Sequence, residues 1–193
     1  MTPKRILDLV LALLLLVPAA MLCVVFAIII WLECRANPIF RQVRLGKDKV
    51  PFALYKLRTM APATRQGTSH EVGSATILRC GSLLRRLKID ELPQIWNILK
   101  GEMSFIGPRP GLPQDAALTA ARDAHGVFSL LPGISGPAQL AGLDMSTPVE
   151  LANADAAYLS DWSLGRDLSI MVQTAGGRGF WDASNTSTPG RKS

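Results

Sequence analysis

The sequence predicts an α+β protein in which an N-terminal membrane helix, interrupted near Pro18, precedes a small, mostly helical domain with short strands. Three observations support this: a long uncharged apolar run near the N-terminus, two short β-type segments after it, and amphipathic segments with helical spacing. With 193 residues, 48% of them hydrophobic, the chain has room for one compact domain and an appendage. We expect the membrane helix in residues 1–36, the domain in residues 37–175 and a disordered tail in residues 176–193.

The apolar run extends from Leu9 to Leu32, 24 residues without a charge. A straight helix of this length is about 36 Å long, enough to cross a hydrocarbon core of about 30 Å. Pro18 lies near the middle of the run. Because proline inside a helix removes a hydrogen bond and clashes with the preceding turn, we expect a kink or a break there. A cleaved signal peptide fits poorly, since the run is too long and Ala19 and Ala20 lie inside it.

Basic residues flank the run on both sides: Lys4 and Arg5 before it, and Arg35, Arg41 and Arg44 after it. A helix that crosses a membrane normally has more basic residues at one end than at the other. Two topologies therefore remain open from the pattern alone. In one, the helix enters the membrane, breaks at Pro18 and returns to the same face; in the other, a kinked helix crosses once.

Charge is divided unevenly along the chain, whose net charge is +6. Residues 35–89 carry twelve Lys and Arg against two acids, whereas residues 90–193 carry seven against eleven. A basic block directly after a membrane segment is typical of a cytoplasmic face that meets anionic lipid or phosphate. We expect no nucleic-acid partner, because neither zinc-finger spacing nor an aromatic RNA-binding motif accompanies the charge.

The domain is predicted to begin with two strands and to continue with helices. The strands are expected at residues 39–45 and 50–57, on either side of a turn. Helical spacing is found in residues 77–89, 93–100, 149–159 and 167–174. Residues 61–73, rich in Thr, Ser, Gly and Gln, are expected to form a mobile loop. The helix at 77–89 has leucines among basic residues, so its apolar face suits the core or a membrane surface.

Two adjacent acids, Asp90 and Glu91, follow the most basic stretch of the chain and precede Pro93. Because proline disfavours helical geometry in the residue before it, we expect Leu92 to leave that geometry and the acids to lie at a junction between two helices. The N-H groups and the positive dipole end of a helix that begins at Pro93 would favour ionised carboxylates at this junction.

The basic residues beside the junction allow two interpretations. With Arg85, Arg86 and Lys88 close in sequence, the junction could hold a phosphate beside a carboxylate that attacks it and forms an acyl phosphate. Alternatively, Arg86 and Asp90 have the i,i+4 spacing of an ordinary solvated ion pair on a helix.

Arg109 lies between two prolines in the sequence Gly107-Pro108-Arg109-Pro110. Its backbone has little freedom, so its guanidinium can be presented to a phosphate in a bidentate manner. The alternative is a rigid surface turn. A second segment rich in Gly and Pro, residues 131–142, either allows close approach of a ligand to its backbone or merely connects two elements.

Together these residues resemble the bacterial sugar transferase family, the monotopic phosphoglycosyl transferases that start glycan assembly on polyprenyl phosphate. The similarity runs through KRILD (4–8), the proline-interrupted apolar run, FRQVRLGKDKVPFALYKLRTM (40–60), LRRLKIDELPQIWNILKGEMSFIGPRP (84–110), LPGISGPAQ (131–139) and YLSDWSLGRDLSI (158–170). The resemblance implies an enzyme of the bacterial cytoplasmic (inner) membrane with its catalytic domain on the cytoplasmic face. Its substrates would be a nucleotide-activated sugar, usually a UDP-sugar, and polyprenyl phosphate, and its products UMP and a polyprenyl diphosphate sugar.

The resemblance also implies roles for particular residues. Asp90 takes the position of the nucleophile that forms a covalent phosphosugar-aspartate, and Glu91 the position that handles protons. Both carboxylates are expected to help hold Mg²⁺, which would offset the repulsion between two approaching anions. The family arginine five residues before the nucleophile falls on Arg85, so Arg86 is kept as a structural partner of Asp90. Substrate phosphates are expected to contact the basic side chains of Arg85, Arg109, Lys56 and Arg58.

For the membrane segment, the resemblance favours a re-entrant helix broken near Pro18, with amphipathic helices at the membrane surface. The chain departs from the family in two places: Val17 replaces the serine before the proline, and residues 141–144 read AGLD where many relatives have NGRN. A membrane-tethered module that binds phosphorylated lipid without chemistry is the alternative function. The pattern specifies neither the sugar, the nucleotide base nor the oligomeric state.

Overall fold

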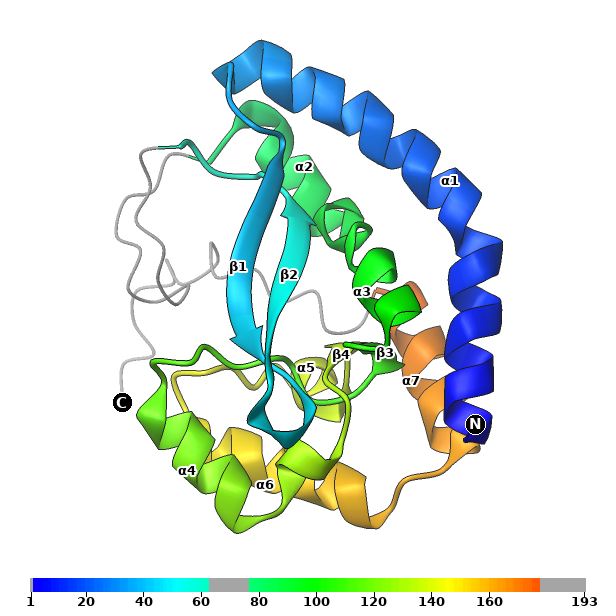
Figure 1. Cartoon of the computed structure of the whole chain (residues 1–193), viewed down its shortest axis with the longest axis vertical. Helices are drawn as coiled ribbons and strands as arrows, with labels where there is room; N and C mark the ends of the chain where they lie inside the picture. Colours follow the sequence, from blue (N-terminus) through cyan, green and yellow to red (C-terminus); the bar gives the residue numbers. More distant parts are fainter. Residues whose placement is uncertain (1, 63–76, 178–193) are drawn as a thin grey trace, which may run out of the picture.

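The structure, a computed structural model, describes residues 2–62 and 77–177 and is α+β, as predicted (Figure 1). The strands are β1 (Ile39–Leu45), β2 (Pro51–Leu57), β3 (Ser104–Ile106) and β4 (Gly133–Ser135). The helices are α1 (Pro3–Cys34), α2 (Arg79–Arg86), α3 (Gln94–Lys100), α4 (Ala116–Ala124), α5 (Pro137–Leu140), α6 (Pro148–Ser160) and α7 (Leu164–Ala175). Most of the mobile loop predicted at 61–73 and nearly all of the predicted tail lie outside the described residues.

The strands form two small sheets. β1 and β2 pair antiparallel from Ile39 opposite Leu57 to Leu45 opposite Pro51, which confirms both predicted strands to within one residue. β3 and β4 pair in parallel, with Ser104 opposite Gly133. The second sheet was not predicted, because three-residue strands next to Gly and Pro carry no alternating pattern long enough to recognise.

α1 is continuous from Pro3 to Cys34 with Pro18 inside it, and it bends near its middle (Figure 1). The prediction that Pro18 interrupts the helix is therefore wrong. Of the kink or break expected there, the structure shows a bend. The missing hydrogen bond and the clash at proline are absorbed by the bend, and helical backbone continues on both sides. The bend lets one face of α1 follow the surface of the domain.

Small side chains bring α1 close to the domain. Ala12 and Ala19, seven residues apart and hence on one face of the helix, are 0% and 7% exposed. They pack in a cluster with Ile95 and Ile98 of α3 and with Phe52 of β2. Most of the remaining apolar side chains of α1 are exposed, and only 11% of its most hydrophobic 18-residue window is buried.

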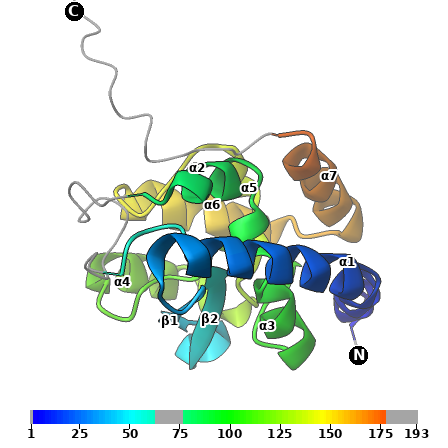
Figure 2. The same cartoon turned by 90° about the horizontal axis from the view of Figure 1, so that it is seen from above.

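Polar contacts fasten both ends of α1 to the domain. Near the N-terminus, Lys4 pairs with Asp167 of α7, and Arg5 donates to the carbonyl oxygens of Ile98 and Leu99 at the end of α3. Near the C-terminus, the carboxylate of Glu33 accepts hydrogen bonds from the first N-H groups of α2. The helix thus lies along the domain, and seen from above it runs across the domain's width (Figure 2).

The predicted helix at 77–89 and the geometry expected at Leu92 are both corrected. α2 ends at Arg86, and Lys88 then takes a left-handed conformation with φ 54°. Leu92 is helical, with φ −55° and ψ −36°, so Pro93 continues a helical path that began before it. The chain turns at Lys88 rather than at Leu92, because packing of the short turn outweighs the local bias of a residue before proline.

The C-terminal part contains the predicted helices and two that were missed. α6 and α7 confirm the predictions at 149–159 and 167–174 with slightly longer bounds. α4 and α5 were missed because they are short and, in α4, rich in alanine, so no apolar stripe marks them. α4 packs on α6 through buried Leu118 and Leu151, and this pair of helices lies behind the segment that carries Arg109.

Candidate active site

The two adjacent acids lie in a 3₁₀ turn, Ile89–Glu91, between α2 and α3. Asp90 is 8% exposed and Glu91 is 9% exposed. Several backbone N-H groups here donate to nearby carbonyls: Glu91 N to Lys88 O at 3.2 Å, Ile95 N to Leu92 O at 3.1 Å and Trp96 N to Pro93 O at 3.1 Å. Two of the N-H groups at the start of α3 are thus already used, and the positive charge that acts on the carboxylates comes from side-chain cations.

Glu91 is held by two cations from distant parts of the chain. Lys56 of β2 places its Nζ 2.6 Å from Glu91 Oε1, and Arg109 Nη1 lies 3.5 Å from the same oxygen. Burial by itself raises the pKa of Glu91, but the charges of Lys56 and Arg109 outweigh it and lower the pKa to about 2. Glu91 is therefore a permanent anion that joins β2, the turn and the Gly107–Pro110 segment.

Asp90 has the opposite electrostatic balance. Burial raises its pKa to about 6, with the neighbouring charge of Glu91 acting in the same direction and those of Lys56, Arg85 and Arg109 against it. Among the described residues, none donates a hydrogen bond to its carboxylate. Asp90 thus lies beside Lys56, Arg85 and Arg109, and within residues 2–62 and 77–177 its carboxylate oxygens accept no hydrogen bond.

The four predicted phosphate-binding residues are not all brought together. Lys56 and Arg109 reach Glu91, and Arg85, whose charge acts on Asp90, donates from Nε to Thr59 Oγ1 at 3.0 Å. Arg58 instead donates from Nε to the carbonyl of Asn37 at 2.7 Å, at the junction of α1 and β1. Arg86, kept as a partner of Asp90, makes no ion pair with it in the described part of the chain, because the turn at Lys88 breaks the helical spacing.

The second segment rich in Gly and Pro packs against the first through its backbone. A Cβ on Gly133 would lie 2.1 Å from Gly107 N, and one on Gly136 would lie 2.4 Å from Gly107 O. These glycines are therefore required for close contact with the Gly107–Pro110 segment. Residues 131–142 therefore do more than connect two elements, because their glycines allow close backbone contact with Gly107.

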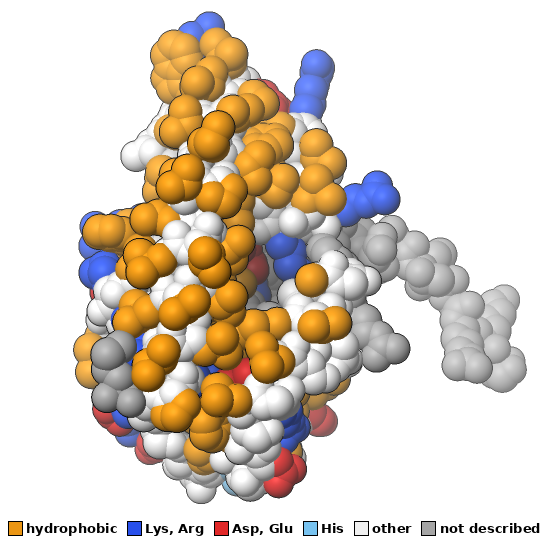
Figure 3. Space-filling model, turned by 90° about the vertical axis from the view of Figure 1, so that its right-hand side faces the viewer, with side chains coloured by type: hydrophobic (Ala, Val, Ile, Leu, Met, Phe, Trp, Pro, Cys, Tyr) orange, Lys and Arg blue, Asp and Glu red, His pale blue; other side chains and the backbone are white. Residues whose placement is uncertain are grey.

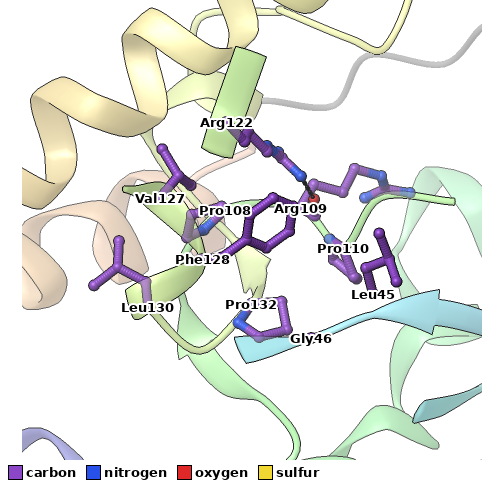
Figure 4. A pocket seen from close by; sticks show the side chains of 10 residues that line it. All are labelled: Leu45, Gly46, Pro108, Arg109, Pro110, Arg122, Val127, Phe128, Leu130 and Pro132. Carbon is purple, nitrogen blue, oxygen red and sulfur yellow. Dashed lines mark hydrogen bonds between the residues drawn. The ribbon is translucent and has the colours of Figure 1, made fainter. Parts of the chain in front are cut away.

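A shallow apolar recess lies behind the Gly107–Pro110 segment (Figure 4). It is lined mainly by prolines and apolar side chains, Phe128 and Val127 among them, and by the stems of Arg109 and Arg122. Neither Asp90 nor Glu91 lines it. The recess thus belongs to the packing around the Gly107–Pro110 segment and does not include the two acids.

The sequence matches the family described as bacterial sugar transferase over residues 1–178. The chain belongs to the bacterial sugar transferase family. The match covers α1, both acids and the segment with Arg109, so the membrane helix and the candidate site fall within one family unit.

Curated relatives of this sugar transferase carry related names. A Caulobacter vibrioides protein named UDP-glucose:undecaprenyl-phosphate glucose-1-phosphate transferase is 39% identical over 183 residues, covering 89% of this chain and 67% of the relative. A Bacillus subtilis protein named "Uncharacterized sugar transferase EpsL" is 34% identical, covering 89% and 84%. An Aeromonas hydrophila protein named UDP-N-acetylgalactosamine-undecaprenyl-phosphate N-acetylgalactosaminephosphotransferase is 33% identical, covering 89% and 42%.

The carboxylates of this sugar transferase fit the way Mg²⁺ binds in phosphate chemistry. Magnesium usually takes one or two protein carboxylates and fills its other positions with water and substrate phosphates. Asp90 and Glu91 can supply two such ligands, and no cluster of three or more His, Cys, Asp or Glu that could form a complete metal cage occurs among residues 2–62 and 77–177. The donor set suits a metal that arrives with a diphosphate.

Two arginines near the site were not singled out from the sequence. Arg44 of β1 donates to the carbonyl of Pro110, and Arg122 of α4 donates to the carbonyl of Arg109. Arg44 and Pro110 are 66 residues apart in the sequence, and Arg122 and Arg109 are 13 residues apart. No local spacing signals such contacts, although a basic residue on the buried face of a strand or helix would be a clue once the register is known.

Proposed function

We propose that this sugar transferase moves a phosphosugar from a UDP-sugar to undecaprenyl phosphate, forming an undecaprenyl diphosphate sugar and UMP. The observation that carries the proposal is Asp90, a nearly buried carboxylate with uncommitted lone pairs beside Lys56, Arg85 and Arg109. The names of the relatives support the substrates, and they specify glucose in one case and N-acetylgalactosamine in another. The sugar used by this chain is therefore a matter for direct assay.

The reaction proceeds in two displacements at one phosphorus. An Asp90 oxygen attacks the phosphorus that carries the sugar, and the bond from this phosphorus to the oxygen bridging the two phosphates breaks, so that UMP leaves with the bond's electrons. An oxygen of the lipid phosphate then attacks the same phosphorus. The bond to Asp90 breaks, its carboxylate is restored, and the lipid diphosphate sugar is released.

The cations and Glu91 stabilise charge at this phosphorus. Arg85 and Arg109 offer guanidinium groups to the phosphate oxygens, which accumulate negative charge as the bonds change. Glu91 holds Lys56 and Arg109 in place through its ion pairs. Asp90 and Glu91 would hold Mg²⁺, which would supply positive charge against the diphosphate.

The raised pKa of Asp90 serves its role as a nucleophile. A more basic carboxylate is a better nucleophile, while a pKa of about 6 leaves it ionised at neutral pH. Burial therefore makes Asp90 more reactive than an ordinary surface aspartate, and the neighbouring cations prevent it from being fully protonated.

A membrane topology in which α1 does not cross the bilayer is part of the proposal. Both ends of α1 are fastened to the same domain, at Asp167 and at the start of α2, and its outward face is apolar. Figure 3 displays this face, where apolar side chains cover the length of the helix. A helix that crossed would carry one end away from the domain and leave those contacts unmade. Exposed Leu83 and Leu87 beside Arg85 provide a lipid-facing approach to the site.

The experiment measures UMP release by the full chain in membranes with undecaprenyl phosphate and a panel of UDP-glucose, UDP-galactose and UDP-N-acetylgalactosamine. We expect UMP from at least one donor and a requirement for the lipid phosphate for turnover. Binding of undecaprenyl phosphate without UMP from any nucleotide sugar would support a binding module instead. For topology, cysteines introduced at Thr2 and at Asn37 are labelled from outside sealed cells. Equal protection of both agrees with the proposal, and labelling of one alone contradicts it.

A further inference from the structure

The backbone that carries Arg109 is held by an unbroken series of hydrogen bonds. Four consecutive carbonyl oxygens accept from different donors: Pro108 O from Gly133 N at 2.9 Å, Arg109 O from Arg122 Nη1 at 2.8 Å, Pro110 O from Arg44 Nη1 at 3.0 Å and Gly111 O from Leu45 N at 3.0 Å. Two of these donors belong to strands and two are arginine side chains. The segment therefore has little freedom to shift, since a shift in any direction breaks at least one bond.

Arg122 is the more deeply buried of the two arginines, with a side chain 3% exposed. Its Nε and Nη2 donate to Asp155 Oδ2 at 2.9 and 2.7 Å, and Asp155 is 1% exposed. The remaining terminal nitrogen, Nη1, reaches the carbonyl of Arg109 (Figure 4). The carboxylate on α6 thus fixes the orientation of a planar guanidinium on α4, and the guanidinium fixes a peptide of the segment in front of it.

The guanidinium of Arg109 depends on this backbone for its place in the site. Its side chain points away from Arg122 (Figure 4), is 41% exposed and meets the site through the long, 3.5 Å contact with Glu91. An exposed side chain with one weak contact is located mainly by where its Cα lies. Arg109 is also flanked by prolines, so movement of its peptide moves the guanidinium as a unit.

We propose that Arg122 and Asp155 form a positioning pair that sets the Arg109 guanidinium against the phosphate of the nucleotide sugar. The inference rests on the proposed function, because it assigns Arg109 a contact with that phosphate. Neither Arg122 nor Asp155 touches substrate; both act through the carbonyl of Arg109. A buried ion pair does not always stabilise a fold. The hydrogen bond from Arg122 Nη1 to the carbonyl of Arg109 gives this pair a second role, which is to position the segment.

If Arg122 and Asp155 only stabilised the core, we would expect a different result. Replacing either of them would lower stability and reduce the amount of folded enzyme, but the activity of each folded molecule would be independent of Arg109. A positioning pair instead loses its effect once Arg109 is gone, because nothing remains to be positioned.

The experiment is a double-mutant cycle of Arg122→Lys and Arg109→Ala, measured as kcat and KM for UMP release by the full chain in membranes with the donor that the wild type accepts. Lysine keeps the charge beside Asp155 but has one nitrogen and cannot reproduce the three-point contact. We expect Arg122→Lys to lower kcat about tenfold to a hundredfold, with a smaller change in KM, because a misplacement of about 1 Å suffices for such a loss. In the Arg109→Ala background the same change should alter kcat by less than about twofold.

The matched control is Arg5→Lys. Arg5 also donates through two guanidinium nitrogens to backbone carbonyls, those of Ile98 and Leu99, but at the far end of α3. Its effect on kcat should be the same with and without Arg109. If Arg122→Lys does not fold, Asp155→Asn, which leaves Arg122 in place, replaces it in the double-mutant cycle with Arg109→Ala.

Equal losses of kcat in both backgrounds, or unchanged kcat with lowered stability, would overturn the positioning role while leaving the proposed function intact. A wild type that released no UMP from any donor would overturn the proposed function and the inference together.

Discussion

Two buried carboxylates in this molecule, Asp167 and Asp90, differ in the number of hydrogen bonds that their oxygens accept. Asp167, 0% exposed, accepts from Lys4, from the hydroxyl of Tyr158 and from Nε1 of Trp162. Asp90, 8% exposed, has three cations near it, yet no described residue donates a hydrogen bond to its carboxylate. The carboxylate of Asp167 thus accepts three side-chain hydrogen bonds, whereas that of Asp90 accepts none from the described residues.

Under the proposed mechanism, this difference separates a structural carboxylate, Asp167, from the nucleophile, Asp90. The donors around Asp167 use its lone pairs to join α1, α6 and α7, and burial together with the bond to Asp167 raises the pKa of Tyr158, which keeps the phenol a neutral donor. The cations around Asp90 act through their charge, which leaves its oxygens available for the attack on phosphorus that we propose. Both carboxylates are buried, so burial does not distinguish them. They differ in whether their oxygens accept hydrogen bonds from the protein.

The largest expected effect is on chemistry at Asp90. Asp90→Asn should lower kcat for UMP release at least about a thousandfold, because the amide cannot form the acyl phosphate, while the protein stays folded. Asp167→Asn should leave kcat per folded molecule near that of the wild type. Comparable losses from both substitutions would erase the distinction between the two carboxylates.

The next effect is on stability at Asp167. Asp167→Asn should destabilise the protein by about 3 kcal/mol, because Lys4, whose side chain is 17% exposed, keeps its charge but loses the carboxylate that it pairs with. Denaturant unfolding in detergent measures this. Ser169→Ala on the exposed face of α7 serves as the control; it removes only an exposed hydrogen bond from Gln173 and should change stability by less than about 0.5 kcal/mol. An unaltered midpoint for Asp167→Asn would show that the carboxylate of Asp167 does not support the fold.

A smaller effect of opposite sign is expected for the stability of Asp90→Asn. The pKa of Asp90 in the folded state, about 6, lies above the ordinary value of 3.8, so the folded state binds more protons between these values and stability falls as pH rises through this window. In the absence of divalent metal the asparagine variant should be more stable than the wild type by about 2–3 kcal/mol at pH 8. The difference should shrink at pH 5 and on addition of Mg²⁺. A wild type as stable as the variant at pH 8 without metal would contradict the unfavourable burial of charge at this position.

The smallest effect is a shift in the pH profile. Activity requires ionised Asp90, so kcat/KM should fall as pH drops through about 6. Of the charges acting on Asp90, that of Lys56 lowers its pKa most. Lys56→Met should therefore move the acidic limb to higher pH, by about one unit. Lys49→Met, which removes a lysine from an exposed pair with Asp123, is the control and should leave the limb in place.

The parts of the site that could be predicted lie close together in sequence. Asp90, Glu91 and Arg109 stand in short, unusual patterns whose chemistry is recognisable without a structure. Lys56 was predicted from the resemblance, and β2 does bring it to Glu91. Arg58, two residues further along, was predicted in the same way but donates to Asn37, because a strand's register and the local turn decide where each side chain points.

The parts that could not be predicted depend on tertiary contacts. Leu92 is helical in spite of Pro93, because the buried turn and α3 pack as one unit. The role of Arg122 requires Asp155, which is 33 residues away and on another helix. The bend of α1 at Pro18 was foreseeable from the sequence, but the attachment of both its ends to one domain was not, since Glu33 and Asp167 look like ordinary surface acids until the fold is known.

The most direct test of the account is to identify what becomes bonded to Asp90. Enzyme is mixed with UDP-sugar labelled in the sugar-linked phosphate and in the sugar, without undecaprenyl phosphate, then quenched in acid and digested for mass spectrometry. The account predicts a phosphosugar on the peptide that contains Asp90, and its disappearance when the lipid phosphate is added before the quench. Formation of the lipid diphosphate sugar at the normal rate, with label never found on that peptide, would contradict it.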